Sequence, residues 1–148
     1  MQVFIVGTPL ETAMALDRRR LNKQIIECGQ ILDALNGAKA WSNHPCVLQY
    51  RKHKEWLSLY KHFLESFVEY QEFGTDGPKD DIRVYGHTCF LISPSFHTQE
   101  YFDQMKRRLY TKDKEHYKQW AHLGESDVNW YWSHEKQEFI KYRNGKRI

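Results

Sequence analysis

The sequence predicts a single domain built mainly from α-helices. Apolar residues recur at three- and four-residue steps over two long stretches, 17–35 and 46–73, which is the period of a helix that buries one face. The chain of 148 residues is long enough to bury a core of its own, and it contains no internal repeat, low-complexity run or clear linker. We therefore expect residues 1–148 to fold as one domain.

The first long stretch, residues 17–35, is expected to form a helix of about five turns. Asp17 suits the N-cap of this helix, and Asn36-Gly37 suits its end. On a helical wheel the apolar side chains fall in one sector, which predicts a stripe that faces the core: Leu21, Ile25, Cys28, Leu32 and Leu35.

A charged face lies at the edge of this stripe, and it allows two interpretations. Its members are Arg20, Lys23, Gln24 and Glu27. Mixed charges usually mark a solvated face, on which Glu27 would form surface ion pairs that contribute little to stability. A carboxylate that neighbouring cations keep ionised also suits acid–base chemistry, which makes these four residues candidates for a functional site.

The remaining N-terminal elements are shorter. Residues 1–6 are apolar and alternate loosely, which predicts a short strand or an extended segment packed on the core. Residues 7–9, Gly-Thr-Pro, interrupt this segment, and residues 12–16 suit a short helical turn. A loop is expected over 38–45, before the second long helix over 46–73.

The C-terminal half is less regular. Residues 75–95 show no clear pattern. Apolar residues at helical steps predict a helix over 98–110, and a shorter helix is expected over 112–122. The final stretch is aromatic and basic, and its Asn144-Gly145 pair predicts a small hairpin over 139–148.

The charge and the aromatic content permit nucleic acid as a partner without requiring it. The net charge is +3, and the chain has five Trp, nine Tyr and eight Phe. Most aromatic side chains are expected in the core, although aromatics beside basic residues also suit stacking on bases. The cations form two clusters: Arg18, Arg19, Arg20 and Lys23 near the N-terminus, and Lys141, Arg143, Lys146 and Arg147 near the C-terminus.

Cysteine and histidine usage predicts neither disulfides nor a metal. Three widely spaced cysteines argue against a disulfide framework, so we expect reduced thiols and a cytoplasmic location. The sequence contains no run of about 18 apolar residues, so we expect no transmembrane helix and no membrane partner. The pairs His44-x-Cys46 and His87-x-Cys89 lack the usual ligand spacing of structural zinc. The sequence also lacks a nucleophile elbow, a phosphate-binding glycine loop and a dinucleotide fingerprint, and we expect no cofactor.

Several runs of residues resemble a known family. LDRRRLNKQIIECGQILDAL, WSNHP shortly after it, and KDKEHY with the aromatic end are similar to the pyrimidine-dimer DNA glycosylase-like family, which includes phage endonuclease V and short bacterial and phage relatives. The likeness covers the N-terminal third well; beyond residue 73 it rests on Lys112-Asp113, His116-Tyr117 and the region of Trp130 and Trp132. It implies a compact all-α helical bundle, with an extended N-terminus and an aromatic, basic C-terminal tail, that binds damaged duplex DNA and excises a base in a bacterial or phage-infected cell.

The resemblance also implies roles for individual residues. Glu27 matches the essential helix carboxylate of the family, and Met1 stands where the family carries its amino-terminal nucleophile. Binding of nucleic acid or a nucleotide is implied for residues of the main helix, the following loop and the tail: Arg18, Arg20, Lys23, Gln24, Asn43, His44, Tyr142, Arg143, Lys146 and Arg147. We expect the polar pocket along the main helix to be closed by Asn43 and His44.

The chain departs from the family pattern at its start and at three later positions. The glycosylase begins Met-Thr and uses the threonine amine, whereas this chain begins Met1-Gln2, and Gln2 is too large to favour removal of Met1. Ile26 replaces an arginine, and a histidine and a serine of the short relatives are replaced by Met105 and Arg107. We therefore expect strand scission through residue 1 to be weak, with excision by water that Glu27 activates and an abasic site left uncut.

Two other functions suit the same residues. The first is a non-catalytic pocket whose cations and stacking aromatics bind a free signalling nucleotide. A phage protein of this kind would sequester the nucleotide. A structural nucleic-acid binder is the third possibility. The sequence leaves these open and does not indicate an oligomeric state.

Overall fold

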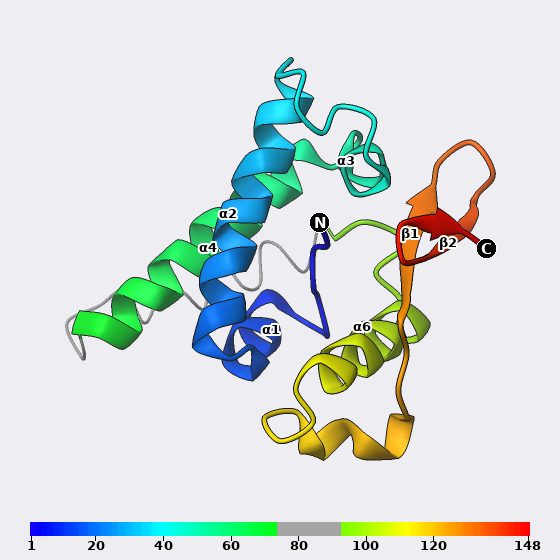
Figure 1. Cartoon of the computed structure of the whole chain (residues 1–148). Coiled ribbons are helices and arrows are strands. Elements are labelled where there is room, and N and C mark those ends of the chain that lie inside the picture. The colour runs from blue at the N-terminus through cyan, green and yellow to red at the C-terminus, as the bar shows by residue number, and fades with distance from the viewer. Residues whose placement is uncertain (74–92) are drawn as a thin grey trace.

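The chain places its elements on two sides of its own N-terminal segment. The computed structural model describes residues 1–73 and 93–148. In Figure 1, α2 and α4 lie side by side on one side of the N-terminus, and α6 and a small sheet lie on the other. The elements are α1 (Pro9–Ala15), α2 (Arg18–Leu35), α3 (Pro45–Tyr50), α4 (Lys54–Phe73), α6 (Gln99–Lys112), the 3-10 helix η2 (Lys118–Leu123), β1 (Val128–Ser133), β2 (Glu138–Arg143) and β3 (Lys146–Arg147).

The pairing of α2 with α4 follows from their apolar stripes. α2 buries Leu21, Cys28 and Ile31. α4 buries aromatic and aliphatic side chains that recur at helical steps: Trp56, Leu57, Tyr60, Phe63, Leu64 and Phe67. Each helix therefore presents one continuous apolar face to the other. The predicted core position of Cys28 is confirmed, since its side chain is fully buried.

Residues 1–6 are extended and run through the interior without joining a sheet. Their buried peptide groups need hydrogen-bond partners other than water. The Gln24 side chain of α2 provides them in the way a neighbouring strand would. Its Oε1 accepts the Phe4 N–H at 2.9 Å, and its Nε2 donates to the Gln2 carbonyl oxygen at 2.7 Å. The expected extended segment is confirmed, and its partner is a side chain.

Two tyrosine hydroxyls bind other carbonyl groups of the same segment. Tyr60 of α4 donates to the Phe4 carbonyl oxygen at 2.8 Å, and Tyr131 of β1 donates to the Met1 carbonyl oxygen at 3.1 Å. Together with the bonds from Gln24, these bonds attach α2, α4 and β1 to the extended N-terminal segment. The N-terminal segment is thus the common partner of elements that are far apart in sequence.

The all-α prediction is wrong, because the C-terminal part of the chain forms a three-stranded antiparallel sheet in the order β1-β2-β3. The predicted turn at Asn144-Gly145 is present and joins β2 to β3. The residues before this turn were expected to form a tail, but β1 and β2 pair as a further hairpin, which is the first along the chain. Aromatic and β-branched residues in β1 and β2 favour strands. The loop between β1 and β2 contains no glycine. Gln137 instead adopts the left-handed backbone conformation, with a φ of 53°, that glycine usually occupies in a hairpin loop.

Two predicted helices have different bounds in the structure. The stretch 46–73 is divided into α3 and α4 by a turn at residues 51–53. α6 continues to Lys112, and only η2 forms within the expected helix 112–122. The C-terminal extension of α6 matters for the site, because it carries Lys112 toward α2.

Asp17 connects the start of α2 to the segment before η2. It is the N-cap residue, as predicted, but its carboxylate does not bind the helix N–H groups. It accepts a hydrogen bond from the Tyr117 hydroxyl and lies 3.1 Å from Arg20 Nη1. Burial opposes ionisation of Asp17, but the bonds from Tyr117 and Arg20 outweigh it, so its pKa lies below the usual value. Arg20 is thereby fixed in position.

Some expectations lie outside the described residues. The structure describes only residues 93–95 of the stretch 75–95, and both His87 and Cys89 belong to the part that is not described. Among the helices of residues 1–73 and 93–148, none has the length and apolar character needed to cross a bilayer.

We expect Gln24→Ala to destabilise the protein by about 2–4 kcal/mol, since it leaves the Phe4 N–H and the Gln2 carbonyl without a partner in the interior. Urea denaturation followed by circular dichroism measures this loss. Gln30→Ala is the matched control on the same helix, because the structure gives Gln30 no hydrogen bond to the N-terminal segment. Equal losses in the two variants would show that Gln24 does not anchor this segment.

Candidate functional site

A cleft of about 340 Å³ lies where α2, the N-terminal segment and α6 meet. Three elements and the extended segment contribute side chains to it: Met1, Gln2, Phe4, Arg19, Arg20, Lys23, Gln24, Glu27, Arg108, Lys112 and Asn129. Five of these residues are cationic and one is a carboxylate. The lining of the cleft is therefore predominantly cationic around a single acidic group, a charge distribution that favours anions.

Glu27 is the carboxylate of this cleft, and it is only 8% exposed. Its Oε2 accepts the Gln2 N–H and the Gln24 Nε2–H, each at 3.3 Å, while its Oε1 lies 3.7 Å from Lys23 Nζ. The amide of Gln24 thus binds both the N-terminal segment and Glu27. Because Gln24 and Glu27 are three residues apart on one helix, the carboxylate and the segment are held in a fixed relation.

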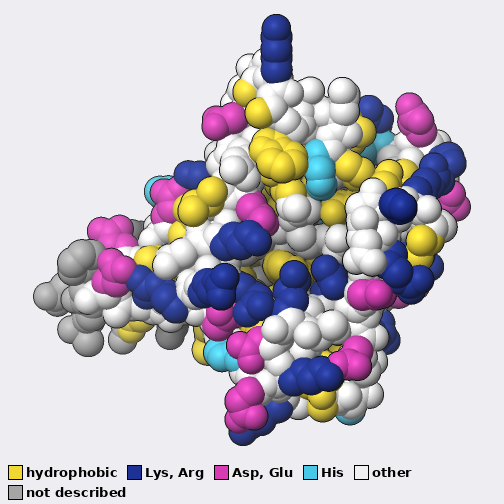
Figure 2. All heavy atoms as spheres, in the orientation of Figure 1, with side chains coloured by type: hydrophobic (Ala, Val, Ile, Leu, Met, Phe, Trp, Pro, Cys, Tyr) yellow, Lys and Arg dark blue, Asp and Glu magenta, His cyan; other side chains and the backbone are white. Residues whose placement is uncertain are grey.

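The cations of the cleft come from two helices. Arg20 of α2 pairs with Asp17 and lies over the Tyr117 ring, with its guanidinium carbon 5.9 Å from the ring centre. Arg108 of α6 donates to Asn129 Oδ1 at 2.9 Å and to the Ser126 carbonyl oxygen at 3.2 Å. Figure 2 shows Lys and Arg side chains gathered in a band across the middle of this face.

Lys112, at the end of α6, completes the cationic wall. Partial burial lowers its pKa, and the neighbouring charges of Arg108, Arg20 and Lys23 lower it further, while Glu27 acts in the opposite direction. Lys112 is exposed by surface area but lies within the cleft, where hydration is incomplete. Its amine therefore loses its proton more readily than that of an ordinary lysine.

The structure brings together some of the residues expected in one site. Met1, Arg20, Lys23, Gln24 and Glu27 all line the cleft. Arg18 does not line it. This residue, at the start of α2, forms an ion pair with Glu72 and a hydrogen bond with Gln71 at the end of α4.

Asn43 and His44 do not close the cleft as expected. His44 is the N-cap of α3, and its Nδ1 accepts the Cys46 N–H at 3.1 Å. Its ring lies edge-on to Tyr131, and burial lowers its pKa. Asn43 instead lines a second, smaller pocket. The loop before α3 therefore packs beside the sheet, and neither residue lines the cleft of Glu27.

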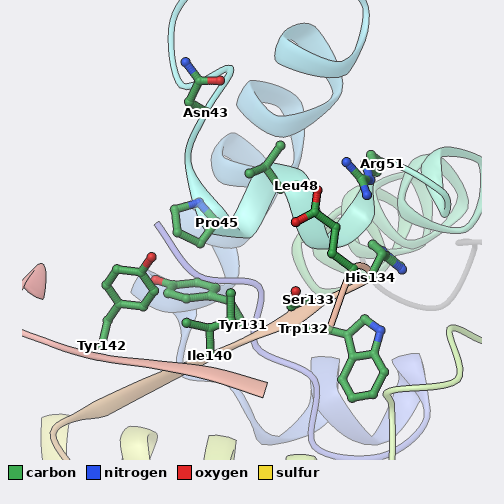
Figure 3. A pocket seen from close by; sticks show the side chains of 11 residues that line it. Asn43, Pro45, Leu48, Arg51, Tyr131, Trp132, Ser133, His134, Ile140 and Tyr142 are labelled. Carbon is green, nitrogen blue, oxygen red and sulfur yellow. The ribbon is translucent and has the colours of Figure 1, made fainter. Parts of the chain in front are cut away.

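The second pocket has a volume of about 190 Å³ and lies between α3 and the sheet. Figure 3 shows Pro45 and Leu48 of α3 facing Tyr131, Ile140 and Tyr142 of β1 and β2. Its lining also includes Asn43, Arg51, Trp132, Ser133, His134 and Glu135. Tyr142, expected to bind nucleic acid, belongs to this pocket rather than to the cleft.

The cations of the C-terminal hairpin form a separate surface. Arg143 binds Asp127, with its Nε 2.9 Å from Oδ1, and Lys146 and Arg147 are exposed on β3. None of the three lines the cleft or the second pocket. They form a basic edge of the sheet.

The contribution of α6 and β1 to the cleft was not predicted from the sequence. Arg108 and Lys112 of α6 and Asn129 of β1 line the cleft, as does Arg19, which the sequence marked only as part of a charge cluster. The available signal was the Lys112-Asp113 pair in the resemblance and the basic residues on the helix expected over 98–110. Among the described residues, no group of three or more His, Cys, Asp or Glu side chains is arranged to hold a metal ion.

Comparison with known proteins gives one result that bears on this site. The model of the family described as pyrimidine dimer DNA glycosylase matches residues 1–74, half of the 148-residue chain. The matched part contains the N-terminal segment and α2 with Glu27, but not α6. No curated protein and no solved structure matches the chain. The resemblance found in the sequence is thereby confirmed, and the chain belongs to the pyrimidine dimer DNA glycosylase family.

Proposed function

We propose that this protein binds duplex DNA and excises a damaged or modified base, with the cleft beside α2 as its active site. The family match supports DNA binding of the glycosylase type. The observation that carries the proposal is the position of Glu27: a nearly buried carboxylate in the lining of a cleft that also contains five cationic side chains. Cations suit the phosphates on either side of a target nucleotide, and the carboxylate suits the sugar between them.

Glu27 is proposed to act on the bond between sugar and base. As the base leaves with the bonding electrons, the sugar develops positive charge, which a nearby carboxylate stabilises. The same carboxylate can take a proton from the water that attacks C1′ of the sugar. The Gln2 N–H, the Gln24 amide and Lys23 orient this carboxylate.

The remaining cations are proposed to bind the DNA backbone. Arg19, Arg20 and Arg108 line the cleft, and Arg143, Lys146 and Arg147 extend the basic surface along the hairpin. We propose that Arg18, Asn43, His44 and Tyr142 contact the DNA from outside the cleft. The alternative of sequestering a free nucleotide receives no support from the family match.

We expect Glu27→Gln to abolish base excision while the protein remains folded. Glutamine keeps an oxygen that accepts the Gln2 N–H, so the free energy of unfolding should fall by only about 1 kcal/mol. Excision should fall by at least about 100-fold, because the carboxylate charge and its proton-accepting capacity are lost. The assay measures cleavage of the glycosidic bond in a thymine-dimer duplex as alkali-labile strand breaks, because the detached base stays linked to its neighbour within the dimer, and thermal unfolding is the control. Unchanged excision, or an unfolded variant, would show that Glu27 is a structural residue.

We expect the affinity for duplex DNA to fall steeply with salt, because each neutralised phosphate contributes about 0.9 to the slope of log affinity against log salt. Arg19→Ala with Lys23→Ala should reduce this slope by up to about 2, and the triple change of Arg143, Lys146 and Arg147 to Ala should also flatten it. Fluorescence anisotropy at several salt concentrations measures the slope.

The matched control for this measurement is Lys39→Ala with Lys52→Ala, since these exposed lysines line neither the cleft nor the hairpin. It should leave the slope unchanged. Affinity that does not depend on salt, or an equal effect of all three variants, would contradict a DNA site at the cleft.

A further inference from the structure

We propose that Lys112 is the amine nucleophile of the cleft and that it cuts the DNA strand at an abasic sugar. This inference rests on the proposed function, because the abasic sugar is the product of base excision in the same cleft. Lys112 lies outside residues 1–74, so the family match assigns it no role. The inference also revises the expectation that the abasic site is left uncut.

The geometry separates Lys112 from the other lysine of the cleft. Lys23 forms an ion pair with Glu27, and its side chain is 69% exposed. For Lys112, within residues 1–73 and 93–148, the structure gives no ion pair and no hydrogen bond. It lines the same cleft as Glu27 from the opposite helix. Lys112 is thus an amine that faces the carboxylate across the space where the sugar is proposed to bind.

The backbone nitrogen nearest the carboxylate cannot serve as the nucleophile. The nitrogen that contacts Glu27 Oε2 at 3.3 Å belongs to Gln2, which follows Met1 in this sequence. Its lone pair is delocalised in the peptide bond, and its N–H donates to Glu27. The amines that line the cleft are therefore the α-amine of Met1 and the side chains of Lys23 and Lys112. Of these we assign the reaction to Lys112, and the position of the adduct described below separates the three.

The electrostatic surroundings of Lys112 favour its neutral form. Partial burial and the charges of Arg108 on its own helix and of Arg20 and Lys23 on α2 lower its pKa; Glu27 on α2 opposes this effect. Only the neutral amine has a lone pair for attack, so a lowered pKa increases the reactive fraction at neutral pH.

The proposed reaction begins with the aldehyde form of the abasic sugar. The Nζ lone pair attacks C1′, a new C–N bond forms, and water leaves to give a protonated imine. A base, for which Glu27 is the carboxylate in place, removes a proton from C2′. The C3′–O bond then breaks, and the 3′ phosphate leaves with its electrons. Water adds to the imine and releases the sugar aldehyde, which returns Lys112 to its free form.

The test uses the full-length protein, a duplex with one abasic site, and sodium borohydride, which reduces an imine to a stable amine. We expect a covalent protein–DNA adduct, and peptide mapping by mass spectrometry should place it on Lys112. Lys112→Arg keeps the positive charge and removes the nucleophile, so it should lose the adduct while still binding the duplex. Lys114→Arg is the control, because Lys114 is fully exposed and Glu125 raises its pKa; it should keep the adduct.

A pH series adds a second readout that a purely structural role would not change. Adduct formation should increase with pH and level off well below about 10.4, the ordinary pKa of lysine. The profile is expected because a lowered pKa makes the neutral amine predominate at lower pH. A profile that levels off only near the ordinary lysine value would contradict the proposal.

The outcomes separate this proposal from the proposed function. An adduct that maps to residue 1 or to Lys23, or that persists in Lys112→Arg, overturns the role of Lys112. Absence of an adduct with the wild-type protein also overturns it. In that case cleavage of the glycosidic bond in a thymine-dimer duplex, detected as alkali-labile strand breaks, shows that the proposed function still holds. Failure of both glycosidic-bond cleavage and DNA binding would overturn the proposed function as well.

Discussion

The structure depends on the pairing of the Gln24 side-chain amide with the extended N-terminal segment. Each residue of an extended segment in the interior has a backbone N–H and a carbonyl group. Because water does not reach them, these groups need hydrogen-bond partners within the protein. Gln24 meets two of these needs at Gln2 and Phe4, and Tyr60 meets a third. The segment can therefore lie between α2 and α6 without a neighbouring strand (Figure 1).

The same amide determines the geometry of the cleft. Gln24 Nε2 also donates to Glu27, so the carboxylate is oriented by the residue that anchors the segment. α6 then faces α2 across the segment and brings Arg108 and Lys112 to the opposite wall. A folding requirement of the N-terminus and the chemistry of the site are thus linked through one side chain. This link explains why residues from the start and the last third of the chain share one cleft.

The sequence predicted the elements whose signal is local. The helix α2, the extended segment and the Asn144-Gly145 turn follow from periodicity and turn chemistry, and the charged face of α2 pointed to Arg20, Lys23, Gln24 and Glu27. The core stripe of α2 was only partly predicted: Leu21 and Cys28 are buried, but Ile25, Leu32 and Leu35 are only partly buried, and the buried face also includes Gln24 and Glu27. The first hairpin was missed because its loop has no glycine and uses Gln137 at a positive φ.

The other half of the cleft could not be predicted from the sequence. Contacts between α2 and α6 depend on how the segment separates them, and no local pattern encodes that spacing. The packing of the loop before α3 against the sheet is also a long-range feature. Asn43 and His44 were therefore expected at the cleft but lie beside the sheet.

The most direct test of the account is a crystal structure of the Glu27→Gln variant bound to a thymine-dimer duplex. The account predicts that the sugar of the damaged nucleotide lies in the cleft between α2 and α6, within about 3.5 Å of the side chain at position 27. Its flanking phosphates should contact Arg19, Arg20 or Arg108. A complex with the damaged nucleotide in the pocket between α3 and the sheet, or with DNA on a face remote from α2, would contradict it.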